Sequence, residues 1–180
     1  SKCVYCDFYS VAGYDDADRY VEAVKKELRF QNGFLQGEPL RTIYFGGGTP
    51  SLIEAAKLQE IIDEIKSIWD AGRLTEITVE ANPDDLTLGY LQLLAQTGVT
   101  RRSVGIQSVG DRQLRFMRRR HTAAAAELAV RNARKAGFGN ITIDLIYGIP
   151  GASGDSWKHN IEKALELDVQ HISAYHLTIE

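Results

Sequence analysis

The chain has 180 residues, of which 44% are hydrophobic and 25% charged, and its formal net charge is -3 at pH 7. This length and composition can bury one substantial core, so we expect a single domain over residues 1–180. The small negative charge argues against general binding to nucleic acid, and we expect neither a signal peptide nor a membrane span, because no apolar run approaches the length of one.

Both cysteines lie in one short peptide, Cys3-Val4-Tyr5-Cys6. A pair with this spacing can be half of a zinc site, a thiol redox couple or part of an iron–sulfur loop. The sequence has no second Cys-x-x-Cys or His pair to complete a zinc site, and the pair does not open the strand and helix of a thioredoxin-like site. The two cysteines also make a poor disulfide framework, and iron-bound thiolates need a reducing compartment, so we expect a cytoplasmic protein.

After the cysteines, amphipathic helical segments alternate with short apolar strands. The expected elements, in chain order, are a helix at 17–30, a strand at 41–45, a helix at 54–69, a strand at 76–80, a helix at 87–97, a strand at 103–107, helices at 111–117 and 123–136, a strand at 141–147, a helix at 156–167 and a strand at 171–178. Asp15 and Asp16 precede the first helix, and Ser51 is the expected cap of the second. This repetition predicts an α/β fold with a parallel sheet, either closing towards a barrel or open and doubly wound.

Glycines and polar residues stand where the apolar strands end. They are the run 46–49, Glu80 and Gln107, and a further polar residue, Asp144, lies inside the apolar run 141–146. The C-terminal strand ends of such sheets carry the ligand sites, and glycines there let a ligand reach the backbone. A tight turn is the alternative for the glycines alone, but a carboxylate inside an apolar run needs a polar partner. Four successive strands therefore predict one shared ligand site.

The cysteine loop and residues 43–50 resemble the radical S-adenosylmethionine (SAM) superfamily, in which a Cys-x-x-x-Cys-x-x-Cys loop holds a 4Fe–4S cluster. The first cysteine of that motif would lie four residues before Cys3, so we expect the chain to be a fragment. The resemblance implies a partial (βα)6 barrel, curved but unclosed, with its first strand and a C-terminal domain outside this chain.

Five motifs, at residues 46–51, 79–83, 104–108, 119–122 and 143–151, are similar to the oxygen-independent coproporphyrinogen III oxidase family. This resemblance implies that Cys3 and Cys6 ligate the cluster and that Tyr5 contacts SAM. It also implies that SAM is lined by Gly46, Gly47, Gly48, Thr49, Glu80, Gln107, Arg119 and Asp144.

Phe8 stands where the oxidase has a further cysteine, and with the motifs at 119–122 and 171–180 it resembles the heme-chaperone branch of the family. That branch implies heme as an additional ligand, heme-acceptor proteins as partners and an electron donor for the cluster. The oxidase, which converts propionates of a porphyrinogen to vinyl groups, is the alternative, so whether the chain is an enzyme stays open. A zinc-binding or thiol-redox domain is the third possibility.

A local basic cluster consists of Arg115, Arg118, Arg119 and Arg120. The resemblance assigns Arg119 to the site through its distance from Gln107, and its two neighbours are expected on a solvated helix face. Among the histidines, His121 is expected to cap or pack a helix and His176 to lie near the exit of the last strand.

Overall fold

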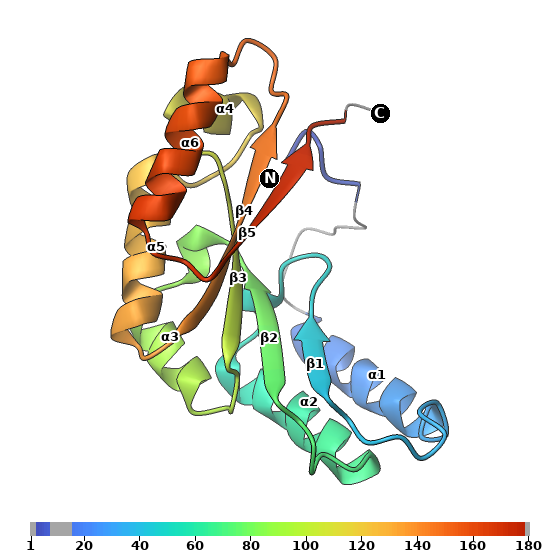
Figure 1. Ribbon diagram of the computed structural model, residues 1–180. Helices are drawn as coiled ribbons and strands as arrows, with labels where there is room; N and C mark the ends of the chain where they lie inside the picture. The colour runs from blue at the N-terminus through green and yellow to red at the C-terminus, as the bar shows by residue number, and fades with distance from the viewer. Residues whose placement is uncertain (1–2, 8–15, 179–180) are drawn as a thin grey trace.

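The computed structural model describes residues 3–7 and 16–178, and it forms one curved sheet with helices on its outer side (Figure 1). The elements, in chain order, are α1 (Ala17–Phe30), β1 (Thr42–Phe45), η1 (Pro50–Leu52), α2 (Ala55–Ile68), β2 (Glu76–Ala81), η2 (Pro83–Asp85), α3 (Leu88–Ala95), β3 (Arg101–Gln107), α4 (Asp111–Phe116), α5 (Ala123–Lys135), β4 (Asn140–Tyr147), α6 (Gly154–Glu166) and β5 (His171–His176). The predictions about Phe8 and Asp15 fall outside the described residues.

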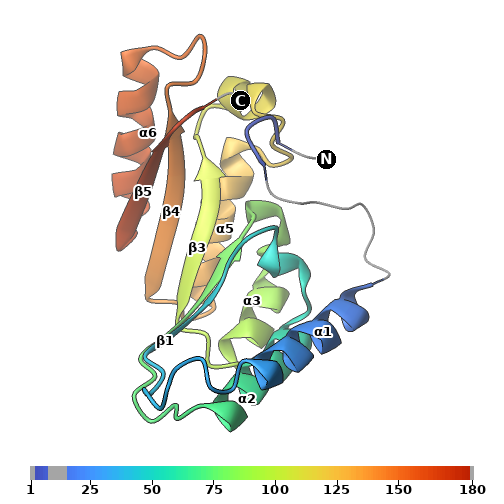
Figure 2. The same ribbon diagram turned by 90° about the vertical axis from the view of Figure 1, so that its right-hand side faces the viewer.

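The sheet has five parallel strands, and their spatial order, β1-β2-β3-β4-β5, is their order in the chain. A doubly wound sheet reverses its strand order and carries helices on both faces. Here the order never reverses, and the turned view shows the strands curving around an open, concave side that the helices leave uncovered (Figure 2). The structure therefore confirms the parallel α/β sheet and decides between its two predicted forms in favour of the partial barrel.

The core lies between the convex face of the sheet and the helices. One apolar cluster joins α2 to β1 and β2 through Leu58 and Ile62, and a second joins α5 to β3 and β4 through Ala126 and Ile143; all four side chains are fully buried. Alternate residues of each strand enter this core, so the intervening residues face the concave side.

Two local predictions were wrong in instructive ways. Ser51 does not cap α2, which begins after Glu54; instead its hydroxyl donates to Asp85 Oδ2 at 2.6 Å. Strand β3 begins at Arg101, two residues earlier than predicted. The prediction left out Arg102 because it is charged, but this side chain is buried on the core side, with its guanidinium 3.8 Å from the centre of the Phe138 ring. A cation that stacks on an aromatic face can occupy a core position of a strand where the alternating pattern predicts an apolar residue.

Helix α1 has the predicted bounds, the ends of the other α-helices differ from the predicted ones by at most two residues, and capping contacts explain where α3 and α6 begin. Thr87 caps α3 by accepting a hydrogen bond from the amide of Tyr90 at 3.2 Å. Ser153 caps α6 in the same way, so this helix begins before Ser156. Within the described residues, no helix is both long and apolar enough to cross a membrane.

Candidate functional site

A cavity of about 460 Å³ opens on the concave side, at the C-terminal ends of the strands. All the predicted site residues except Gly46 line it. The site is therefore assembled from the loop of residues 3–7, the turn after β1, the ends of β2 and β3, the segment after α4 and the middle of β4. Parallel strands bring these positions together because their C-terminal ends meet at one edge of the sheet.

Gly46 supports the site from behind the cavity lining. A Cβ at this position would lie 2.8 Å from Cε1 of Tyr44 and 3.2 Å from the carboxyl carbon of Glu80. The absence of a side chain lets these two residues meet, and the Tyr44 hydroxyl donates a hydrogen bond to Glu80 Oε1 at 2.7 Å. Gly47, whose φ of 101° favours glycine, donates its amide to Glu80 Oε2 at 3.2 Å. Glu80 is thus fixed through both carboxylate oxygens.

Arg119 crosses the floor of the cavity. Its Nη2 donates to the carbonyl oxygen of Gly105 at 2.7 Å and to Asn82 Oδ1 at 2.8 Å. Its Nη1 lies 3.4 Å from the Tyr5 hydroxyl and 3.6 Å from Cys3 Sγ. The buried Nε has no hydrogen-bond partner among the described residues. A guanidinium held in this way keeps donor capacity for an anionic ligand.

The end of β3 departs from regular strand geometry at Gln107. Its φ is 61°, which is unusual for a residue other than glycine, and the pairing with β4 shifts between Val104 and Gln107. A Cβ on Gly105 would lie 2.8 Å from Gln107 Nε2, so the side-chain amide of Gln107 packs close to the backbone of Gly105, where there is no side chain. Such a distortion at the rim of a cavity is typical of ligand sites, where a bulge re-aims a side chain.

Asp144 lies on the concave side of β4, with Ser103 Oγ 3.3 and 3.4 Å from its two carboxylate oxygens. Burial raises the pKa of Asp144, the nearby charge of Glu80 raises it further, and the hydroxyls of Ser173 and Ser103 lower it. Two carboxyl groups therefore face the same cavity with different hydrogen-bond environments, and both can accept hydrogen bonds from a ligand.

The thiols of Cys3 and Cys6 lie in a tight turn in which the Cys6 amide donates to the Cys3 carbonyl oxygen at 3.2 Å. Between them, Tyr5 packs against an apolar cluster that includes Leu114 and Met117, and burial raises the pKa of its hydroxyl. The described residues contain no group of three or more His, Cys, Asp or Glu side chains that could hold a metal ion. Two soft thiol donors beside a cavity fit part of an iron–sulfur site, which takes its ligands from cysteine.

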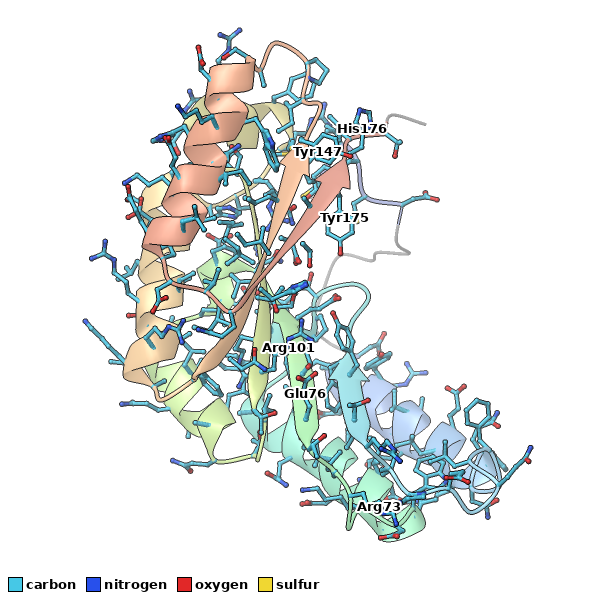
Figure 3. All side chains as sticks on the ribbon, viewed as in Figure 1. Arg73, Glu76, Arg101, Tyr147, Tyr175 and His176 are labelled. Atoms are coloured by element: carbon cyan, nitrogen blue, oxygen red, sulfur yellow. The ribbon has the colours of Figure 1, made fainter. Side chains whose placement is uncertain are left out.

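Sequence reasoning missed several lining residues, chiefly Asn82, Ser103 and Tyr175. Asn82 follows β2 directly, and this polar position at a strand exit could have identified it. Ser103 pairs in register with Glu80, which only the strand alignment reveals. Tyr175 is 57% exposed and projects from β5 towards the concave side (Figure 3). His176 lines the cavity too, with its ring edge-on to Tyr147.

The residues around Arg119 have separate roles. Arg118 and Arg120 follow the end of α4 and do not lie on a helix face as predicted. Arg118 is exposed, whereas Arg120 pairs with Asp84 at 3.5 Å. His121 is buried with its Nε2 3.0 Å from the Ile106 carbonyl oxygen, and it packs inside the structure as expected.

Comparison with family models and with curated proteins gives three findings. The family model for the radical SAM superfamily matches residues 1–164. The chain is 41% identical over 179 residues to the heme chaperone HemW of Lactococcus lactis, covering 99% of this chain and 46% of that protein. It is also 37% identical over 182 residues to the heme chaperone HemW of Bacillus subtilis, covering 99% of this chain and 48% of that protein.

Among solved structures, the coproporphyrinogen III oxidase HemN from Escherichia coli matches with a TM-score of 0.87 and 24% identity, over 99% of this chain and 42% of that chain. This likeness is one of fold. The chain spans about half the length of the curated relatives it matches.

Proposed function

The chain belongs to the radical SAM superfamily, and from this premise we propose that it is the core of a heme chaperone that carries a 4Fe–4S cluster, binds SAM, and binds heme for transfer to acceptor proteins. The observation that carries the proposal is the convergence of two thiols, a glycine turn, two carboxyl groups and a guanidinium on one cavity at the strand ends. The chaperone branch is favoured over the oxidase because the greater sequence identity is to heme chaperones. The proposal includes a cytoplasmic location, since iron-bound thiolates need a reducing compartment.

In this proposal, Cys3 and Cys6 supply two of the thiolates that hold the cluster. The cavity beside these two cysteines would hold SAM next to the cluster. When bound and reduced, the cluster supplies one-electron reduction of the SAM sulfonium. The buried apolar cluster beneath Tyr5 fixes the cysteine turn and keeps water away from its inner side.

The other cavity residues position SAM. Arg119 donates to the carboxylate of the methionine moiety from Nη1, the nitrogen beside the cavity-lining residues Tyr5 and Cys3, and the backbone of the glycine turn after β1 receives the same end of the ligand. Glu80 and Asp144 accept hydrogen bonds from SAM, and Gln107 covers the β3 end of the cavity. The exposed ring of Tyr175 and the side chain of Ile146 provide an apolar wall for the adenine.

The cluster assignment is tested by reconstituting the full-length protein with iron and sulfide without oxygen. The parent should gain the broad visible absorption of a 4Fe–4S cluster, and Cys3→Ala and Cys6→Ala should each lose most of the bound iron and sulfide. Thr178→Ala, an exposed lining residue without a thiol, is the control and should keep them. Unchanged iron content in both cysteine variants would refute the assignment and favour a different use of the thiols.

The chaperone assignment is tested by heme titration of the same full-length protein, followed by transfer to an apo heme protein. Heme binding with transfer, and no conversion of coproporphyrinogen III when cluster, SAM and reductant are present, is the expected result. Vinyl product together with carbon dioxide would establish the oxidase instead and would leave the SAM site unaffected.

A further inference from the structure

A second hollow lies between α4 and α6, and it shares no lining residue with the cavity at the strand ends. Its volume is about 370 Å³, and its walls come from α4, the turn at 150–152 and the first two turns of α6. The turned view shows the segment between β4 and α6 arching between α4 and the start of α6 (Figure 2). We call it the α4–α6 hollow, and the side chains that carry the argument are Arg112, Phe116, His159 and Asn160.

The α4–α6 hollow is separate from the cysteine turn because different sides of α4 face the two. Arg112 and Phe116 are four residues apart, so they lie on the same side of the helix, and both line the hollow. Leu114 and Met117, from another side of the segment, pack in the cluster that includes Tyr5. A ligand in the hollow would therefore not touch the thiols.

Asn160 supplies a buried donor to the hollow. Its side chain is only 2% exposed, and its Oδ1 accepts hydrogen bonds from the amide of Val109 at 2.8 Å and from Ser108 Oγ at 3.2 Å. Because a backbone amide can only donate, this contact fixes which side-chain atom of Asn160 is the oxygen. The Nδ2 group has no acceptor among the described residues, and leaving a buried donor without an acceptor is costly, so a ligand oxygen in the hollow would satisfy it.

Arg112 supplies a positive charge at the opposite wall. Its Nη2 lies 3.7 Å from the position that a Cβ on Gly151 would take, and its guanidinium has no partner in the part of the chain that the structure describes. His159, also on the lining, is exposed and adds an imidazole N–H. The lining carboxylate Asp111 accepts from the amide of Ala123 at 2.8 Å, at the start of α5, where the helix stabilises a negative charge.

We propose that the α4–α6 hollow binds a small organic oxyanion, in which a carboxylate or phosphate group is attached to a flat apolar group. The anionic end accepts hydrogen bonds from Arg112 and from Asn160 Nδ2. The apolar end packs on the ring of Phe116, which is 43% exposed, and on Pro150.

Charge and size together select this class of ligand. A cation would be repelled by Arg112 and would find the oxygen of Asn160 already engaged. Small-molecule sites have volumes of about 300–1,000 Å³ and combine apolar walls with a few polar groups, as this hollow does. A bare inorganic ion would leave its apolar wall uncovered, so the ligand needs an apolar part as well.

The experiment is calorimetric titration of the full-length protein with two probes, phenyl phosphate and benzoate. We expect at least one of them to bind, and the tighter one identifies the oxyanion. Inorganic phosphate and benzyl alcohol, which carry only the anionic or only the apolar part, should bind more weakly. Arg112→Gln should weaken binding of the tighter probe by about tenfold or more, since it removes a charged hydrogen bond. Asn160→Asp keeps the oxygen that accepts from Val109 but replaces the donor with a negative charge, so it should abolish binding.

Arg115→Gln is the matched control, because Arg115 is an exposed arginine of the same helix that does not line the hollow, and this variant should bind as the parent does. Arg112 is exposed and has no protein partner, so its variant should keep the parent melting temperature and decides the question even if Asn160→Asp fails to fold. No binding of either probe by the parent, or equal binding by Arg112→Gln and Arg115→Gln, would overturn the inference. So would displacement of the probe by SAM, which would place it in the other cavity. The titration needs no cluster, so its outcome is independent of the proposed function.

Discussion

Replacing Arg119 with lysine tests the centre of the proposed SAM site. The guanidinium is anchored through Nη2 to the Gly105 carbonyl oxygen at 2.7 Å and to Asn82 Oδ1 at 2.8 Å, while Nη1 lies on the cavity side, 3.4 Å from the Tyr5 hydroxyl. A lysine has one nitrogen, so it cannot keep both anchors and also donate to a ligand carboxylate. A hydrogen bond from a charged group contributes about 1.5–3 kcal/mol, and losing one on ligand binding corresponds to roughly 10- to 140-fold weaker affinity at about 1.4 kcal/mol per factor of ten.

The assay is calorimetric titration of SAM into the full-length, reconstituted protein without oxygen. Arg118→Lys, the same substitution at the exposed neighbouring position, is the control and should bind as the parent does. Asn82→Ala keeps the guanidinium but removes one neutral anchor, so it should lose about 0.5–1.5 kcal/mol of binding free energy. If Arg119→Lys, shown by its melting temperature to be folded, bound SAM as tightly as Arg118→Lys, the assignment of Arg119 to the ligand carboxylate would be wrong.

Two further predictions concern stability, and both can be measured by denaturant unfolding. Because burial raises the pKa of Asp144, the folded state holds its proton more tightly than the unfolded chain does; the resulting stability is present below the ordinary pKa of aspartate and is lost as the pH rises through the raised value. Asp144→Asn should therefore be more stable than the parent at neutral pH and lose that advantage in acid, and a difference that did not depend on pH would contradict this account. Gly46→Ala should cost about 1–3 kcal/mol, because its Cβ would lie 2.8 Å from the Tyr44 ring and would displace Glu80. Gly33→Ala, which has no atom within 4 Å of the added Cβ, is the control and should not destabilise the protein; equal losses in the two alanine variants would remove the steric explanation.

Periodicity and family resemblance, both read from the sequence, predicted the units of this fold and half of the residues that line its cavity. The alternation of helical and strand periods predicted every α-helix and strand of the described residues in the correct order, though not the short helices η1 and η2, because amphipathic patterning depends on residues within a few positions of one another. Strand exits then predicted Glu80 and Gln107 as cavity residues, since consecutive parallel strands bring their C-terminal ends to one edge, and the carboxylate inside an apolar run predicted Asp144.

The tertiary structure alone decided how the units join and which polar side chains meet. The unreversed strand order depends on which strand pairs with which, a choice that no single segment contains. The Ser51 hydroxyl donates to Asp85 and does not cap α2. Arg119 lies in the cavity because Asn82, from a distant segment, accepts its hydrogen bond, whereas Arg118 is exposed to solvent. The buried Arg102 is tolerated in β3 only because Phe138, supplied by the segment after α5, stacks against it. Hydrogen bonds and cation–aromatic contacts of this kind act over a few ångströms in space and are independent of distance along the chain, so the periodicity of the sequence does not record them.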